Sequence, residues 1–122
     1  MRIEALKHEQ LAVPLGEEGT ARRFYSGLLG IPEVEKPPHL AKRGGCWFER
    51  GSLKVHLGVE IDFRPARKAH PAFTVAGLAA LIQRLVEAGC QVVEDEPLTG
   101  YNRRYVSDPF GNRIELMKPV SL

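Results

Sequence analysis

Two stretches of the chain repeat apolar residues with the period of a helix. The apolar positions are Ala21, Phe24, Tyr25 and Leu28 in TARRFYSGLLG (20–30), and Leu78, Leu81, Ile82 and Leu85 in GLAALIQRLVEAG (77–89). A spacing of i, i+3, i+4, i+7 places each set on one face of an α-helix. Each run stops at a glycine, Gly30 or Gly89, a residue suited to the left-handed position after a helix end. The sequence therefore predicts two amphipathic helices.

Strand-like runs surround both helices in the same order. HEQLAV (8–13) and HPAFTV (70–75) precede them, and the runs that follow are GCWFER (45–50), LKVHLGVE (53–60), NRRYVSD (102–108) and RIELM (113–117), with weaker candidates in PEVE (32–35) and QVVE (91–94). Each half reads as a strand, a helix and three strands, and corresponding points lie about 60 residues apart. Such a repeat indicates two copies of one supersecondary unit. We expect one domain, residues 1–122, made of two modules, about 1–60 and 70–119, joined by a linker at 61–69.

Composition narrows the class of protein. The 122 residues are 43% hydrophobic and 26% charged, with a net charge of +2, which is typical of a soluble globular domain with no electrostatic preference for nucleic acid or membranes. The basic run RPARK (64–68) is expected to be a solvated connection. No apolar stretch has the length of a signal segment or a membrane span. The two cysteines, Cys46 and Cys90, indicate reduced thiols in a cytoplasmic protein rather than a disulfide framework.

Polar side chains interrupt the strands on the face that should point away from the helices. Strand alternation gives this face His8, His56, His70 and Glu115, because their sequence neighbours supply the apolar face. The simplest interpretation is a solvated outer face of a sheet. The other is a metal site, since three imidazoles and a carboxylate suit zinc, nickel, iron, cobalt or manganese. Three of the four histidines stand at repeat-related strand positions, which favours the metal site; His39 is expected to lie in a loop.

These motifs resemble the vicinal oxygen chelate superfamily, which includes glyoxalase I, extradiol dioxygenases, fosfomycin-modifying enzymes and bleomycin-resistance proteins. The resemblance rests on HEQLAVP with FYSGLLG, on HPAFTV and on DPFGNRIEL. It implies an α+β fold of two βαβββ modules forming a cup-shaped mixed sheet around a divalent metal ion. The metal ligands implied are His8, His56, His70 and Glu115. Glyoxalase-like members usually hold Glu or Gln in place of His56, and dioxygenase-like members use two histidines and one glutamate, matched here by His8, His70 and Glu115.

The resemblance implies Lewis-acid catalysis on a small substrate that chelates the metal through neighbouring oxygens. The expected function is a lyase, isomerase or dioxygenase of this kind, with His56 and Glu115 as catalytic residues. The alternative is a non-enzymatic binding protein of the bleomycin-resistance type. Side chains expected to contact the substrate are Trp47 or Phe48, Tyr101, Arg103, Arg104 and Tyr105. A homodimer is expected, as is common in the family.

Overall fold

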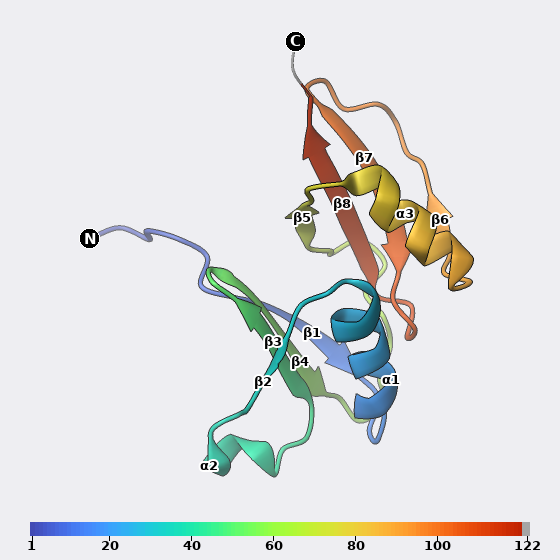
Figure 1. Ribbon diagram of the computed structural model, residues 1–122. Coiled ribbons are helices and arrows are strands. Elements are labelled where there is room, and N and C mark those ends of the chain that lie inside the picture. The colour runs from blue at the N-terminus through green and yellow to red at the C-terminus, as the bar shows by residue number, and fades with distance from the viewer. Residues whose placement is uncertain (121–122) are drawn as a thin grey trace. The chain divides into compact units, whose positions relative to one another are not determined.

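The computed structural model describes residues 1–120 and contains two compact units, Met1–Phe63 (unit 1) and a second that begins at Arg64 (unit 2). Each unit holds one four-stranded mixed sheet with few helices, as the α+β prediction requires (Figure 1). The strand order is β1-β4-β3-β2 in unit 1 and β5-β8-β7-β6 in unit 2. The two halves of the sequence therefore build the same topology.

Unit 1 follows the expected order of elements. Its strands are β1 (Glu9–Val13), β2 (Glu33–Val34), β3 (Cys46–Arg50) and β4 (Leu53–Val59). Strand β1 pairs in parallel with β4, and β3 pairs antiparallel with both β4 and β2. The helix α1 (Glu18–Arg22) continues directly into a π-helical stretch, η1 (Arg23–Leu28). A short helix, α2 (Pro38–Ala41), follows β2. It contains His39, so the prediction of a loop at His39 is wrong; Pro38 at the first helical turn suits a helix start.

Unit 2 repeats this plan with a longer helix. Its strands are β5 (Ala72–Thr74), β6 (Val92–Val93), β7 (Tyr101–Ser107) and β8 (Arg113–Pro119), and its helix is α3 (Leu78–Glu87). Strand β5 pairs in parallel with β8, and β7 pairs antiparallel with β8 and β6. Helix α3 packs against β6 and β8, as Figure 1 shows in yellow and red.

The apolar face of each sheet packs on its own helix. Tyr25 from the π-helical stretch stacks on Phe48 of β3, with ring centroids 5.6 Å apart, and both side chains are fully buried. In unit 2 the buried side chains are Leu78 and Leu85 of α3 and Val106, Ile114 and Leu116 of the strands. Burial of a leucine-sized side chain stabilises a fold by about 1.5–3 kcal/mol. These contacts fix which face of each sheet is left for polar side chains.

The glycines predicted to end the helices adopt the left-handed conformation. Gly30 has φ 75° and Gly89 has φ 84°, angles that cost other residues about 1 kcal/mol or more. Gly45, before β3, is needed for a second reason. With φ +82°, a Cβ atom at this position would lie 2.0 Å from the Leu57 carbonyl oxygen. Only glycine lets the start of β3 approach β4 this closely.

Candidate functional site

The polar face of the unit 1 sheet is centred on His56. Strand β4 pairs His56 with Trp47 of β3 and with Gln10 of β1, while the neighbours Val55 and Leu57 are buried in the core. His56 itself is only 3% exposed. The predicted alternation is therefore observed, but the face at this point is closed to solvent.

Three rings form a stack on this face. The ring centroids of His8 and His56 lie 4.4 Å apart, and those of His56 and Trp47 lie 4.0 Å apart with an interplanar angle of 4°. His8 stands immediately before β1. Its Nδ1 atom is buried and has no hydrogen-bond partner among the described residues. An unpartnered buried nitrogen costs about 1–3 kcal/mol, so this atom lacks the partner that a buried polar atom ordinarily has.

Glu49 orients the His56 ring. Its Oε2 atom lies 2.7 Å from His56 Nε2. The pKa of His56 is lowered, because burial disfavours the imidazolium more strongly than the Glu49 hydrogen bond favours it. The hydrogen bond to His56 in turn lowers the pKa of Glu49. These directions fit a neutral His56 that donates Nε2–H to an ionised Glu49, which leaves the Nδ1 lone pair as the atom that can accept a proton or bind a cation.

Glu115 is the corresponding residue of unit 2, and it is not on a solvated face. It is 6% exposed, and β8 places it opposite Ala72 of β5 and Tyr105 of β7. Its Oε1 atom lies 3.1 Å from His70 Nε2, and its Oε2 atom lies 3.1 Å from Arg103 Nη1. Burial alone would raise the pKa of Glu115, but the hydrogen bonds from Arg103 and His70 lower it overall. A charge is stable here because two polar partners compensate its burial.

Both ring nitrogens of His70 face acceptors. Nδ1 lies 2.9 Å from the Lys68 carbonyl oxygen, which can only accept, so Nδ1 carries a hydrogen. Nε2 faces Glu115 Oε1. A neutral ring would therefore direct an Nε2 lone pair at a carboxylate, which is repulsive. A cation bound to Nε2 would remove that repulsion.

The residues predicted to contact substrate fall into two groups. Trp47, Tyr105 and Arg103 lie on the polar faces with His56 or Glu115, and the Arg103 Nη1 atom is 3.2 Å from the Tyr105 hydroxyl. Tyr101, exposed, occupies the outer end of β7. Arg104 pairs with Leu116, so its side chain leaves the sheet on the opposite face, where its Nη2 atom lies 3.0 Å from Glu94 Oε1. Phe48 is a core residue. The structure therefore does not bring Arg104 or Phe48 to the polar faces.

Two residues of these faces were missed from the sequence, Glu49 and Arg113. The Arg113 guanidinium carbon lies 3.8 Å from the Tyr105 ring centroid. Strand alternation could have found both: Glu49 follows Trp47 by two residues, and Arg113 precedes Glu115 by two.

The donor atoms of these side chains are of the chemical type that binds a divalent metal ion. The structure brings His8 together with His56 in unit 1, and His70 together with Glu115 in unit 2. Neutral imidazole nitrogens and a carboxylate are ligands for zinc and its neighbours, and the unpartnered His8 Nδ1 is the kind of atom such an ion would satisfy. Among residues 1–120, no group of three or more candidate ligands is assembled. Each unit thus holds one pair of candidate donors.

Comparison with known proteins places the chain in a family. The model of the Glyoxalase/Bleomycin resistance protein/Dioxygenase superfamily matches residues 9–116. The chain belongs to this superfamily. A glyoxalase family protein from Bacillus anthracis is 47% identical over 98% of this chain and 100% of its own, with a TM-score of 0.92. No functionally curated protein matches the chain.

More distant superfamily structures share the fold alone. A fosfomycin resistance protein from Listeria monocytogenes is 16% identical, with a TM-score of 0.75 over 98% of this chain and 96% of its own. TnmS3, an antibiotic binding protein from Streptomyces, is 20% identical, with a TM-score of 0.73 over 98% of this chain and 100% of its own. A fosfomycin resistance protein and an antibiotic binding protein therefore share this fold. Within the described part of the chain, no helix has the length and apolar character needed to cross a membrane.

Proposed function

We propose that this superfamily member is a small divalent-metal-dependent enzyme that acts on a small oxygen-chelating organic substrate, by lyase, isomerase or dioxygenase chemistry. The proposed metal ligands are His8, His56, His70 and Glu115. The observation that carries the proposal is the buried Nδ1 atom of His8, which has no partner among the described residues and lies in a ring stacked on His56.

The protein groups have separate roles in this proposal. Glu49 holds the Nε2–H of His56, so that His56 presents Nδ1 as a ligand or a base. The Lys68 carbonyl fixes the hydrogen of His70 on Nδ1 and leaves Nε2 for the metal. Glu115 adds the negative charge that offsets a divalent ion. When bound, the metal supplies Lewis-acid stabilisation of charge that develops on substrate oxygen.

The ligand assignment is tested by metal content after dialysis of folded variants. Glu115→Gln keeps the shape of the side chain but removes its charge, and we expect metal to be lost or much weakened. His56→Ala leaves His8, His70 and Glu115, and should retain measurable metal. Glu60→Gln, at an exposed carboxylate beyond β4, is the matched control and should behave as the unchanged protein. Equal retention in Glu115→Gln and His56→Ala would overturn the assignment.

Activity would then be sought with several metals. The substrates to compare are the hemithioacetal of methylglyoxal, catechols and fosfomycin. Metal occupancy should fall below about pH 6, because imidazoles must be neutral to bind. Metal retention that is the same on both sides of this value, under competition with a chelator, would contradict histidine ligation.

A second candidate function is metal-free binding of a small molecule. The observation that favours it is the contact between Arg103 and Glu115, because a carboxylate already paired with a guanidinium has less negative charge to offer a metal. TnmS3, which shares the fold, is an antibiotic binding protein. Purified protein that carries no stoichiometric metal, and that binds an antibiotic without changing it, would support this function over the enzyme.

We also propose a cytoplasmic homodimer. Cys46 is buried and Cys90 partly buried, and neither forms a disulfide, as suits a reducing compartment. Sedimentation equilibrium at micromolar concentration tests the assembly, and a stable monomer would contradict it.

A further inference from the structure

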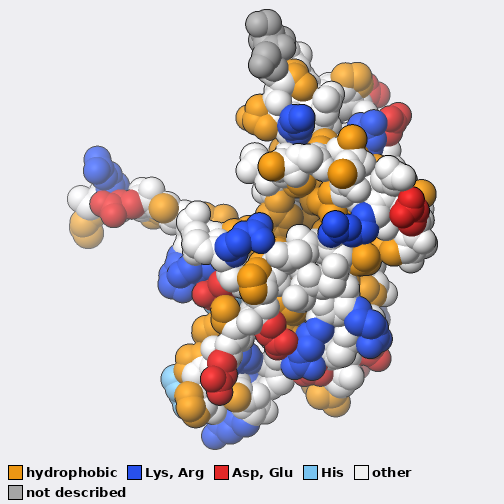
Figure 2. All heavy atoms as spheres, in the orientation of Figure 1, with side chains coloured by type: hydrophobic (Ala, Val, Ile, Leu, Met, Phe, Trp, Pro, Cys, Tyr) orange, Lys and Arg blue, Asp and Glu red, His pale blue; other side chains and the backbone are white. Residues whose placement is uncertain are grey.

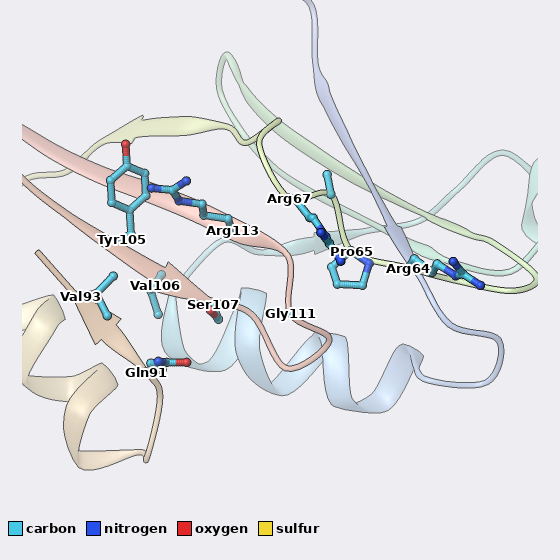
Figure 3. A pocket seen from close by; sticks show the side chains of 11 residues that line it. Arg64, Pro65, Arg67, Gln91, Val93, Tyr105, Val106, Ser107, Gly111 and Arg113 are labelled. Atoms are coloured by element: carbon cyan, nitrogen blue, oxygen red, sulfur yellow. The ribbon is translucent and has the colours of Figure 1, made fainter. Parts of the chain in front are cut away.

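Unit 2 contains a cavity of about 560 Å³ that the proposed metal ligands do not line. One wall is the segment 64–67, and the other is formed by the end of β7, the turn at Gly111 and the start of β8 (Figure 3). The segment packs directly on the turn, since a Cβ atom at Gly111 would lie 3.1 Å from Pro65 Cγ. The basic run RPARK, expected as a solvated connection, is exposed and also builds this wall.

The charged side chains that line the cavity are all basic. Its lining includes Arg64, Arg67 and Arg113 and no acidic side chain. Arg113 has a nearby anion, with its Nη2 atom 3.7 Å from Asp95 Oδ2, but the same oxygen also lies 3.9 Å from Arg103 Nη2. Arg64 and Arg67 make no ion pair or hydrogen bond with any residue in the range 1–120. Positive charge therefore remains available for an anion.

The cavity also has an apolar side. The Arg113 guanidinium carbon lies 3.8 Å from the centroid of the Tyr105 ring, and the apolar side chains Val93, Val106 and Pro65 also line the cavity. Figure 3 shows Arg113 beside Tyr105 on one side, with Pro65 and Arg67 on the facing segment. A guanidinium stacked on a ring keeps its planar edge of N–H donors available for a carboxylate or phosphate. The body of such a ligand would meet apolar atoms.

The face of the molecule drawn in Figure 2 carries charges of both signs. Lysines, arginines and acidic side chains are interspersed over the face shown in Figure 2, so opposite charges lie close together there. In the segment 64–67, Arg64 and Arg67 line a cavity that has no acidic side chain in its lining.

We propose that this cavity binds the anionic group of a small organic acid or phosphate ester with an aromatic body, with Arg113 and Arg67 as the anion-binding residues. Arg64 adds charge at the rim. Binding requires residues of unit 2 only, and it does not depend on a metal.

The test is calorimetric titration of the full-length protein with benzoate, phenyl phosphate, inorganic phosphate and the neutral analogue benzamide. We expect benzoate and phenyl phosphate to bind at least about tenfold more tightly than benzamide, because charge-assisted hydrogen bonds are lost in the neutral analogue. Inorganic phosphate should bind more weakly than phenyl phosphate, because it has no apolar body. Equal binding of inorganic and phenyl phosphate would restrict the site to a simple anion and contradict the proposed ligand class.

Variants locate the binding. Arg113→Gln and Arg67→Gln should each weaken benzoate binding about tenfold, whereas Arg2→Gln, the same change of charge in the exposed segment before β1, should alter it less than about twofold. Arg67 has no partner among the described residues, so Arg67→Gln should fold normally even if Arg113→Gln does not. Unchanged binding in Arg67→Gln would overturn the proposal.

Metal removal separates this proposal from the proposed function. Benzoate titration in the presence of a chelator should give the same affinity as without it. If no metal binds but benzoate binding and its loss in Arg67→Gln persist, the metal proposal fails and this one stands. If metal binds but benzoate does not, the metal proposal stands and the anion-binding proposal fails.

Discussion

The hydrogen bond between Glu49 and His56 predicts how the unit 1 face responds to a change of a single charge. Glu49 Oε2 and His56 Nε2 are 2.7 Å apart, and the side chains are 23% and 4% exposed. Replacing Glu49 by Gln keeps a hydrogen-bond acceptor of the same length and removes the negative charge. Replacing it by Ala removes the acceptor as well and leaves the buried His56 without this partner.

The magnitude follows from the burial of the pair. A hydrogen bond to a charged group contributes about 1.5–3 kcal/mol, and the partial exposure of Glu49 favours the lower end of this range. We expect Glu49→Ala to lower the free energy of unfolding by about 2 kcal/mol and Glu49→Gln by about 1 kcal/mol. The pKa of His56 should fall further in both variants, because the Glu49 carboxylate is the main group that raises it against the effect of burial.

Urea unfolding at constant pH measures the first effect, and an NMR titration of the His56 ring protons measures the second. Glu60→Gln is the control, since it removes an exposed carboxylate that makes no side-chain hydrogen bond with the described residues. An unchanged or raised pKa of His56 in Glu49→Gln would refute the orientation of His56 by Glu49. A loss of stability equal to that of Glu60→Gln would refute the energetic argument.

Three further predictions concern stability. Gly45→Ala should lower the free energy of unfolding in urea by more than about 3 kcal/mol, because its Cβ atom would lie 2.0 Å from the Leu57 carbonyl oxygen. The control Gly51→Ala, at φ +59° in open space, should lower it by about 1 kcal/mol. Equal losses of stability would contradict the close approach of β3 and β4. Asp108→Ala should cost about 3 kcal/mol by thermal unfolding, because Asp108 Oδ1 accepts from the Phe110 and Asn112 backbone N–H groups; a cost below about 1 kcal/mol would show that the turn does not need them. The fold lowers the pKa of His56 from its reference value of 6.5 and the pKa values of Glu49 and Glu115 from 4.5. The stability that these groups contribute is therefore present above the reference values and is lost as pH falls, first through His56 and then through the carboxylates. A free energy of unfolding that rises on acidification would contradict these directions.

The elements were predictable because both periodicities are clear in the sequence. The strand that contains His56 alternates strictly from Leu53 to Val59, and β4 occupies that range. The helix ends were fixed by Gly30 and Gly89, whose φ angles are positive. Even the weak candidates, PEVE and QVVE, contain the short strands β2 and β6. Helix α2 could not be predicted, since a helix of four residues gives no periodic signal.

The candidate site was predictable as a face but not as a set of contacts. Alternation placed His56 and Glu115 on polar faces, and their corresponding positions follow from the repeat. Strand alternation does not predict, however, which residue a long charged side chain contacts. Arg103 and Arg104 are adjacent and chemically identical, yet only Arg103 reaches Glu115, because neighbours on a strand point to opposite faces. The choice between them depends on strand register, which the sequence pattern leaves open by one residue.

The repeat also shows how one fold positions two different chemistries. His56 and Glu115 occupy corresponding positions in their sheets, each in the strand that pairs with the first and third strands of its unit. In unit 1 the central residue is a neutral ring, stacked between His8 and Trp47 and oriented by a carboxylate. In unit 2 the central residue is the carboxylate, and its partners are a guanidinium and a histidine. The strand topology is the same in both halves, and the corresponding position holds an imidazole in unit 1 and a carboxylate in unit 2. In the proposed metal site Glu115 supplies the only formal negative charge, so metal should be lost in Glu115→Gln and retained in His56→Ala.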